Sequence, residues 1–345
     1  MNGKQLRTTL LGFVGTFSIL GLLLYFVGVD GFIGELRRAD NGTVALVVLV
    51  TLGWLSAWGF SLQTVLDVLG VDVSLPQSFF ILNGAMFSNN ITPFGQAGGE
   101  PVTALLISKV ADTEYERGLA AIASVDSLNF IPSISLALVG AAFYATQSSL
   151  GRRLRIATAA LVALSVLVPS VAYVGWRKRD SIQRRITGVV APIIKYLTRI
   201  LPVSSSLNRE EIRSRIGHFV DSIERVATNR RGITLALTAS TAGWAFQMVA
   251  LWLAFAAIGK SVPLSIMLFV VPVGAIAGIT PLPGGAGGIE AVLVALLSSL
   301  PGTAIGVEAA LAAVIIYRGA VYWVPVVIGG GVLSVVGVDT VQQGS

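Results

Sequence analysis

Ile279-Thr280-Pro281-Leu282-Pro283-Gly284-Gly285-Ala286-Gly287-Gly288-Ile289-Glu290 is the stretch that decides the fold. It interrupts the apolar region 263–300 near its middle with prolines and four glycines. Proline removes a backbone donor and glycine weakens a helix, so a continuous membrane-spanning helix is excluded here. Irregular backbone persists at membrane depth only where protein or a water-filled cavity surrounds it. We therefore expect two helices that meet at a turn, as a re-entrant hairpin.

A second interrupted stretch has nearly the same order of residues. It reads Ile91-Thr92-Pro93-Phe94-Gly95-Gln96-Ala97-Gly98-Gly99-Glu100 and lies in the apolar region 76–108. The two runs align from their opening isoleucines through their glycines once the additional Pro283 is allowed for. Four upstream pairs share the offset in residue number of these glycines: Gly70 and Gly259, Val73 and Val262, Leu75 and Leu264, and Phe80 and Phe269. This ordered run predicts an internal duplication.

Duplication of this kind predicts the orientation of the two halves. Each half would contain two helices, a re-entrant hairpin and a last helix, so that three helices cross the bilayer. Because three is odd, the second half must enter from the opposite side. Inverted repeats are an architecture of transporters, whose substrate site lies near the midplane where interrupted helices meet. We predict that 1–150 forms the first half and 151–345 the second.

Composition assigns the chain to the membrane. Of its 345 residues, 54% are hydrophobic and only 12% are charged, and the mean hydropathy is +0.79. Soluble proteins carry about 25% charged residues. The chain has no cysteine, which excludes disulfides and thiolate metal sites. It has one histidine, His218, and this disfavours histidine chemistry. We expect no cofactor and no metal, and an integral membrane enzyme is the least favoured class because no activated nucleophile is visible.

Six apolar runs are long enough to cross the bilayer as helices. The fold class is therefore predicted as an all-α polytopic membrane protein with six full crossings and two re-entrant hairpins. The six runs are 10–28, 43–66, 118–146, 156–176, 232–258 and 309–336.

The basic residues gather in one loop. Residues 177–231 hold 13 of the 24 Lys and Arg residues and 5 of the 18 acidic ones, which gives this segment a net charge of +8. The positive-inside rule then predicts that this loop and both termini are cytoplasmic, in the plasma membrane. Nucleic-acid binding is the competing interpretation, and no recognition motif supports it. Apolar residues at helical spacing in 181–200 and 212–226 predict two basic amphipathic helices on an anionic membrane surface; a solvated linker is the alternative.

Few charges fall inside the predicted membrane segments, namely Glu100, Asp126, Glu290 and Arg318. A charge at the bilayer centre costs about 2.5–3.5 kcal/mol and needs a partner or a cavity. We select these four residues and the turn glycines as candidate substrate-binding residues; the glycines are Gly98, Gly99, Gly284, Gly285, Gly287 and Gly288.

Two interpretations of these residues stay open. In one, Glu100 and Glu290 cap the first turn of a returning helix, and Arg318 forms a buried ion pair with Glu290 or Asp126. In the other, the two helix N-termini and Arg318 bind a headgroup phosphate, while the carboxylates pair with a cationic headgroup, a proton or Arg318.

These motifs resemble a known family. The first hairpin, the second hairpin and a final span with Tyr317-Arg318, Trp323-Val324-Pro325 and Gly329-Gly330 are similar to the transmembrane, flippase-like domain of lysylphosphatidylglycerol synthases, here free-standing. The resemblance covers roughly residues 10–335. It implies a lipid flippase fold that moves a phospholipid or a lipid-linked headgroup between leaflets. We expect no aminoacyl-transferring domain like that of the synthases, so the resemblance does not imply lipid aminoacylation.

Two other function classes compete with a lipid flippase. One is an ion-coupled transporter of a small polar solute, in which Glu100 and Glu290 bind the ion. The other is an accessory membrane protein of a lipid-modifying system, which moves nothing. A flippase needs a groove open to lipid, whereas a solute transporter needs a sealed cavity. Homo-oligomerisation stays open.

Overall fold

The computed structural model describes residues 3–92, 96–147, 152–177, 209–280, 282–299 and 305–342. Within these ranges all regular structure is helical. The first half of the chain contains α1 (Gly3–Val27), α2 (Val29–Arg37), α3 (Asn41–Val68), α4 (Leu75–Ile91), α5 (Gln96–Val110) and α6 (Tyr115–Gln147). The second contains α7 (Arg152–Arg177), α9 (Arg209–Thr228), α10 (Arg230–Ala257), α11 (Leu264–Ile276), η1 (Ala277–Ile279), η2 (Pro283–Gly285), α12 (Gly288–Leu297) and α13 (Val307–Gln342).

Four of these helices are long and apolar enough to cross a membrane, over Asn41–Val68, Tyr115–Phe143, Arg230–Ala257 and Val307–Val335. They correspond to four of the six predicted runs. The other two predicted crossings are not confirmed. In α7 the apolar stretch established by the described residues covers Thr158–Val171. The first run reaches the required length only together with α2.

The chain bends by 92° between α1 and α2. Gly28, at the bend, has a φ of 94°, in the region that favours glycine. The segment between the first two predicted apolar runs is therefore partly helical, since nine of its residues form α2. Apolar and polar residues alternate along α2 at helical spacing, and none of its residues is buried. A short amphipathic helix of this kind suits the bilayer surface.

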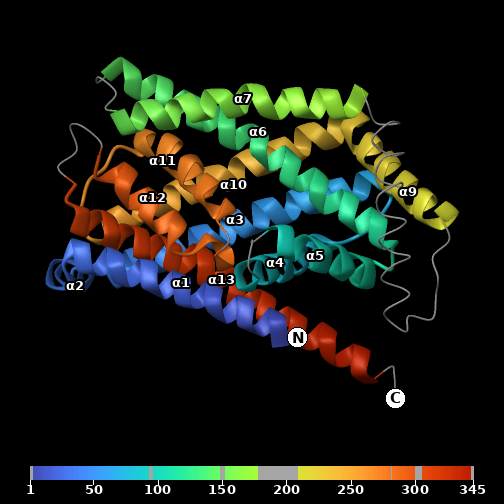
Figure 1. Ribbon diagram of the computed structural model, residues 1–345, viewed down its shortest axis with the longest axis horizontal. Helices are drawn as coiled ribbons and strands as arrows, with labels where there is room; N and C mark the ends of the chain where they lie inside the picture. The colour runs from blue at the N-terminus through green and yellow to red at the C-terminus, as the bar shows by residue number, and fades with distance from the viewer. Residues whose placement is uncertain are drawn as a thin grey trace.

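Both interrupted stretches form a helix, a break and a second helix, as the proline and glycine pattern predicts. In the first, α4 ends at Ile91 and α5 begins at Gln96. In the second, α11 is followed by two short 3₁₀ turns before α12 begins. The two hairpins lie toward opposite ends of the helix bundle in Figure 1, with α4 and α5 toward the right and α11 and α12 toward the left.

Helices α3 and α10 pack against each other in antiparallel directions. At one end the backbone N–H of Asp40 donates to the carbonyl of Ala257, 2.8 Å away. At the other end a Cβ on Gly232 would lie 2.5 Å from the side chain of Val68. A pair of helices in contact along its full length buries an extended apolar seam, which contributes to both hydrophobic clusters of the described residues.

Three tryptophans meet where α3 crosses α10. The ring centroids of Trp54 and Trp58 are 5.3 Å apart, and those of Trp58 and Trp244 are 5.9 Å apart, in edge-to-face arrangements. This close approach requires a glycine, because a Cβ on Gly243 would lie 2.2 Å from the Trp58 ring. Aromatic pairs of this geometry add about 0.5–1.5 kcal/mol beyond the burial of their area.

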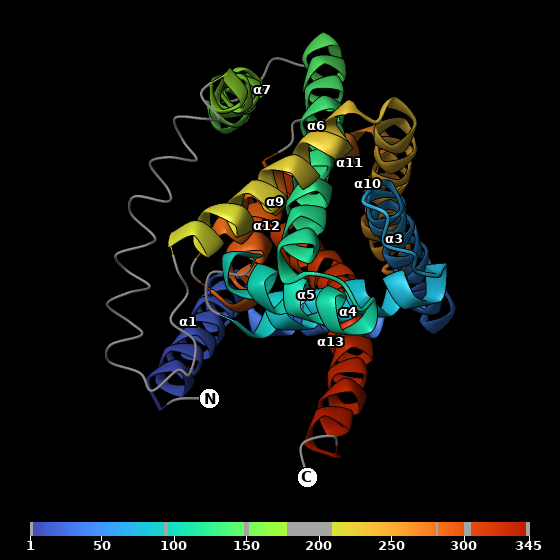
Figure 2. The ribbon, with the colours of Figure 1, turned by 90° about the vertical axis from the view of Figure 1, so that its right-hand side faces the viewer.

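The remaining helices pack across the two halves of the chain. α4 lies against α13, and α11 lies against α6. α9 crosses the beginning of α6 (Figure 2), where Arg215 Nη1 is 2.7 Å from Glu116 Oε1. One side of α9 is partly buried, so this predicted amphipathic helix uses at least part of its apolar side for protein contacts. The other predicted amphipathic segment, 181–200, lies outside the described residues.

Gly329 sets the distance between α4 and α13, which yields a first prediction. A Cβ at this position would lie 2.0 Å from the carbonyl oxygen of Asn83, whereas a Cβ on Gly331 would meet nothing within 4 Å. Gly329→Ala should destabilise the protein by about 1–3 kcal/mol, because backbone cannot move aside without repacking. Gly331→Ala, two residues further along the same helix, should be neutral or slightly stabilising. Unfolding of both variants in detergent, followed by circular dichroism, measures the difference; equal stability would contradict the close packing.

Candidate functional site

The η2 turn and the residues that lead into α12 contain glycines with unusual backbone conformations. Gly284, Gly285 and Gly287 have φ angles of 57°, 64° and 88°. Residues with a Cβ rarely adopt these angles. At Gly288, which begins α12, the φ is not positive, and the restriction is one of space: a Cβ there would lie 3.1 Å from Thr280 Oγ1. All four predicted glycines therefore belong to one compact turn.

Glu290 lies in the first turn of α12, as predicted, and its carboxylate uses both oxygens. Oε2 accepts the backbone N–H of Gly287, which caps the start of the helix. Oε1 accepts from Nε of Arg318 at 2.7 Å. Glu290 is 4% exposed, so its carboxylate is shielded from water. Both of its hydrogen-bond donors are groups of the protein.

Arg318 lies on α13 and is 9% exposed. Besides its bond to Glu290, its Nη2 donates to the carbonyl oxygen of Gly284 at 3.1 Å. Its guanidinium carbon is 5.5 Å from the centroid of the Tyr322 ring, one helical turn further along α13. The sequence predicts either Glu290 or Asp126 as the ion-pair partner of Arg318. In the structure the partner is Glu290.

Tyr322 and Asn90 join the two hairpins. The Tyr322 hydroxyl donates to the carbonyl oxygen of Asn90 at 2.9 Å, and the Asn90 amide donates back to the carbonyl oxygen of Tyr322 at 3.4 Å. A Cβ on Gly284 would lie 2.6 Å from both side chains. The end of α4 therefore lies against the glycine turn before α12. Sequence reasoning missed Tyr322, although its position four residues after Arg318 places both on one face of α13.

The first hairpin is built differently. Gly98 and Gly99 lie inside α5, since this helix begins at Gln96. A Cβ on Gly99 would lie 1.6 Å from Asn89 Oδ1, so only glycine allows α4 to approach α5 here. Glu100 is the fifth residue of α5, and the first turn of α5 contains no acidic residue. The prediction that Glu100 lies in the first turn is therefore wrong. The reason is that α5 begins at Gln96, before its glycine pair, whereas α12 begins at Gly288, the second glycine of its pair.

Asp126 lies on α6 and is not the partner of Arg318. α6 packs against α5, the helix that carries Glu100. One turn further along α6, the side-chain oxygen of Asn129 accepts from Ser240, and its backbone carbonyl accepts from Trp244 at 3.2 Å. The ten predicted residues thus form two groups. One contains Arg318, Glu290 and the four glycines of the second turn; the other contains Glu100, Asp126, Gly98 and Gly99.

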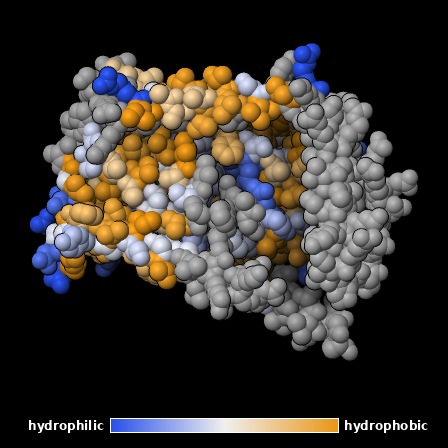
Figure 3. Space-filling model, viewed as in Figure 1, coloured by the Kyte–Doolittle hydropathy of each residue, from blue (hydrophilic) through white to orange (hydrophobic). Residues whose placement is uncertain are grey.

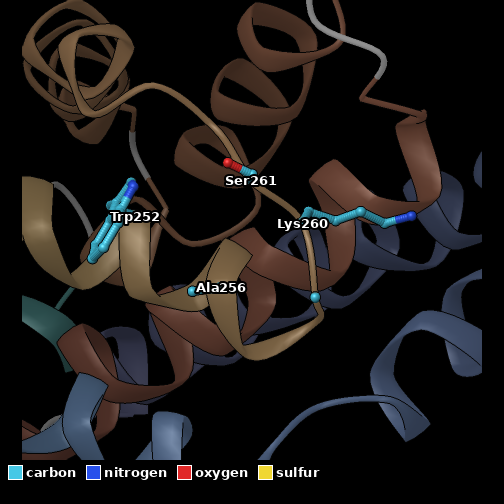
Figure 4. A pocket seen from close by; sticks show the side chains of 5 residues that line it. Trp252, Ala256, Lys260 and Ser261 are labelled. Atoms are coloured by element: carbon cyan, nitrogen blue, oxygen red, sulfur yellow. The ribbon is translucent and has the colours of Figure 1, made fainter.

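A pocket of about 240 Å³ lies elsewhere, at the turn between α10 and α11. It is lined by Trp252, Ala256, Gly259, Lys260 and Ser261 and contains none of the predicted residues. Figure 4 shows the Lys260 side chain extending away from Trp252, and its Nζ is 3.2 Å from Glu35 Oε1. Both polar groups have protein partners, since the indole N–H of Trp252 donates to the carbonyl oxygen of Val262. We assign no role to this pocket.

Comparison with known proteins gives consistent matches over most of the chain. The family described as "Lysylphosphatidylglycerol synthase TM region" matches residues 9–329. A UPF0104 membrane protein of Methanothermobacter thermautotrophicus is 29% identical over 84% of this chain and 83% of its own length. A UPF0104 membrane protein of Pyrococcus horikoshii is 23% identical over 94% of this chain and 96% of its own length. One of Methanocaldococcus jannaschii is 24% identical over 85% of each chain.

The buried ion pair yields a second prediction. Glu290→Gln should destabilise the protein by about 3–5 kcal/mol, because Arg318 stays buried without a negative partner. The double variant Glu290→Gln with Arg318→Gln should lose less than the sum of the two single variants, since neither then leaves an unpaired charge. Urea unfolding of all variants in detergent measures the coupling, with the exposed Asp72→Asn as a control. Additive effects would show that the two side chains do not interact.

Proposed function

Because the chain belongs to the lysylphosphatidylglycerol synthase transmembrane-region family, we propose that it transfers a lipid between the two leaflets of a membrane. The cargo would be a phospholipid or a lipid-linked headgroup. The observation that carries this proposal is the buried Arg318–Glu290 pair at the junction of two interrupted hairpins. Convergent helix breaks with buried charges are the usual location of a transport site.

Transport across the midplane would use an inverted repeat, which the ends of α3 and α10 support. Both helices begin with a side-chain cap: Asp40 accepts the N–H of Thr43, and Asn229 accepts the N–H of Gly232. The two capping residues have the same offset in residue number as Gly99 and Gly288. The caps therefore continue the alignment of glycines that first indicated the duplication.

The opposite ends of α3 and α10 also match. Gly70 follows α3 with a φ of 75°, and Gly259 follows α10 with a φ of 71°. After α3, the carbonyl oxygen of Val73 accepts a hydrogen bond from the Gln63 side chain. After α10, the carbonyl oxygen of Val262 accepts one from the Trp252 side chain. Each of these pairs has the offset of the two helix caps. Because α3 and α10 are antiparallel, a two-fold axis between them would invert one half relative to the other.

The packing between halves supports the same axis. Such an axis exchanges α4 with α11 and α6 with α13. It therefore relates the contact of α4 with α13 to the contact of α11 with α6, and both contacts are present.

We propose six crossings and two re-entrant hairpins, with halves that meet near residue 150. In Figure 1 the beginning of α1, the end of α13 and α9 lie toward the same end of the bundle, which supports cytoplasmic termini in the plasma membrane.

A hollow on the side of the bundle favours a lipid over a free solute. Figure 3 shows hydrophilic side chains on the floor of a hollow that is bordered by apolar surface. The long helices run across this view (Figure 1), so the line of sight lies in the plane of the bilayer and the hollow opens sideways. A polar recess with a lateral opening suits a molecule whose headgroup enters the protein while its acyl chains stay in the membrane.

Arg318 would bind the headgroup phosphate by partner exchange. The carboxylate of Glu290 now occupies the N-terminus of α12 and one edge of the guanidinium. A phosphate fits both groups, because helix N-termini and arginine bind oxyanions in the same way that they bind a carboxylate. A phosphate that displaces Glu290 would take over the N–H of Gly287 and the Nε of Arg318 that the carboxylate now holds.

Orientation gives a third prediction. A short epitope tag in 203–209 should be accessible only from the cytoplasm, and one in 301–307 only from outside. The +8 charge of 177–231 and the inverted repeat both require this. Tag accessibility in intact and permeabilised cells measures it. Two tags on the same side would contradict the repeat.

Lipid movement gives a fourth prediction. Arg318→Lys should slow the translocation of a fluorescent phospholipid in proteoliposomes by about 10- to 100-fold, because loss of a charged hydrogen bond costs about 1.5–3 kcal/mol. Arg38→Lys, at the exposed end of α2, is the matched control and should leave the rate unchanged. Lipid movement at the normal rate by folded Arg318→Lys would remove this residue from the mechanism. Absence of lipid movement by the native protein, with uptake of a small solute, would overturn the proposed function.

A further inference from the structure

The candidate site is closed in this structure. Glu290 is 4% exposed and Arg318 is 9% exposed, so a headgroup can reach them only after one of the surrounding helices moves. From other parts of the chain, α4, α13 and α1 pack against the glycine turn before α12. α4 and α13 carry buried residues of the two hydrophobic clusters, so their displacement would break core packing. α1 is attached differently.

The middle of α1 lies on the glycine turn. A Cβ on Gly15 would lie 3.2 Å from Leu282 Cδ2. Beside this contact the Thr16 hydroxyl donates to the carbonyl oxygen of Ala286 at 3.2 Å. Among residues 12–27 of α1, whose side chains the structure describes, Thr16 is the only buried one. This hydroxyl therefore satisfies a carbonyl group of the irregular turn.

The other end of α1 is fixed. Leu24 and Val27 pack against the larger hydrophobic cluster, and no earlier side chain described in α1 belongs to either cluster. After the bend at Gly28, α2 is held by the ion pair of Glu35 with Lys260, at 3.2 Å. In Figure 1 α1 runs along the lower side of the bundle, and α2 turns aside at its end. α1 thus has a fixed end at Gly28 and a looser part on the glycine turn.

Little opposes an outward movement of the middle of α1. Lipid solvates an apolar helix as well as protein does, so helices in a membrane stay together through close packing and hydrogen bonds. The middle of α1 meets the turn through the packing of Gly12, Gly15 and Ile19 and through the bond of Thr16. Phe17, on another side of the helix, is 69% exposed. Most of this part of α1 is therefore already open to lipid.

We propose that α1 is a lateral gate of the lipid path, which moves about Gly28 and closes on the glycine turn through the bond of Thr16 to Ala286. The inference rests on the proposed function, because a lipid enters from the side and needs an opening in the wall of the bundle. Opening leaves the carbonyl oxygen of Ala286 without its donor, and an unpaired carbonyl is costly at membrane depth. A headgroup that donates to this oxygen would hold the gate open, and its departure would let Thr16 close it.

A tether between α1 and the turn tests the gate. The chain has no cysteine, so an introduced pair is the only target of a short bifunctional thiol reagent. In the variant Gly15→Cys with Leu282→Cys, this reagent would hold the gate shut. Translocation of a fluorescent phospholipid in proteoliposomes should be lost after tethering and should return when dithiothreitol cleaves the tether. Each single cysteine variant, treated alike, should keep its rate.

The pair Gly31→Cys with Glu308→Cys is the matched control. A Cβ on Gly31 would lie 3.8 Å from Glu308 Cβ, a separation that suits a link between two cysteines. This link ties α2 to α13 beyond the bend and leaves α1 free, so translocation should not change. Translocation by the tethered Gly15→Cys, Leu282→Cys variant at its untethered rate, or equal loss in the control, would overturn the gate.

A distance measurement makes the test independent of lipid movement. Spin labels at Phe17→Cys and Val327→Cys, both exposed positions, report the separation of α1 and α13 in lipid nanodiscs. The gate predicts two distances. Thr16→Val should raise the ratio of the open to the closed form by about two- to tenfold, as expected for the loss of one neutral hydrogen bond. Ser18→Ala is the control, because the Ser18 hydroxyl binds the carbonyl oxygen of Val14 in its own helix.

The two measurements separate the gate from the proposed function. If the native protein moves no lipid, the proposed function fails, and the spin-label distances alone decide on the gate. A single distance that Thr16→Val leaves unchanged would overturn the gate, whatever the lipid assay shows.

Discussion

The bond between Arg318 and the turn before α12 is the interaction on which the rest of the site depends. A membrane interior offers no water to a broken helix, so each freed carbonyl group needs a protein donor. Arg318 supplies one to Gly284 and at the same time neutralises Glu290. The carboxylate in turn binds the N–H of Gly287. One guanidinium thus makes an irregular turn compatible with a buried environment, and it ties that turn to the longest helix of the described chain.

Much of this arrangement could be predicted from local sequence. The helix breaks follow from proline and glycine, and four of the six predicted crossings follow from continuous apolar runs. The partner of Arg318 could not be chosen, because Glu290 and Asp126 are both acidic and only the packing of α12 against α13 separates them. The contact between Asn90 and Tyr322 joins residues far apart in the chain, and no periodicity reports such a contact. The position of Glu100 does not follow from the similar glycine runs, because α5 begins before its glycine pair and α12 begins at the second glycine of its pair.

A single residue explains much of the difference between the hairpins. Gly98-Gly99 is followed at once by Glu100, whereas Gly287-Gly288 is followed by Ile289 and then Glu290. One residue rotates a side chain by about 100° around a helix with 3.6 residues per turn. In the second hairpin this rotation directs the carboxylate to the helix start and to Arg318, while Ile289 fills the space beside Gly285. Under the duplication that we propose, one inserted residue gives the two corresponding turns different chemistry.

The three tryptophans at the crossing of α3 and α10 have a practical consequence. They are half of the six indoles in the chain, and they couple Trp54 and Trp58 of one half to Trp244 of the other. Indole emission is sensitive to the distance and polarity of its surroundings. Any rocking of the halves about this crossing would change the optical signal of the unlabelled protein. The molecule carries its own fluorescent reporter at the place where its halves meet.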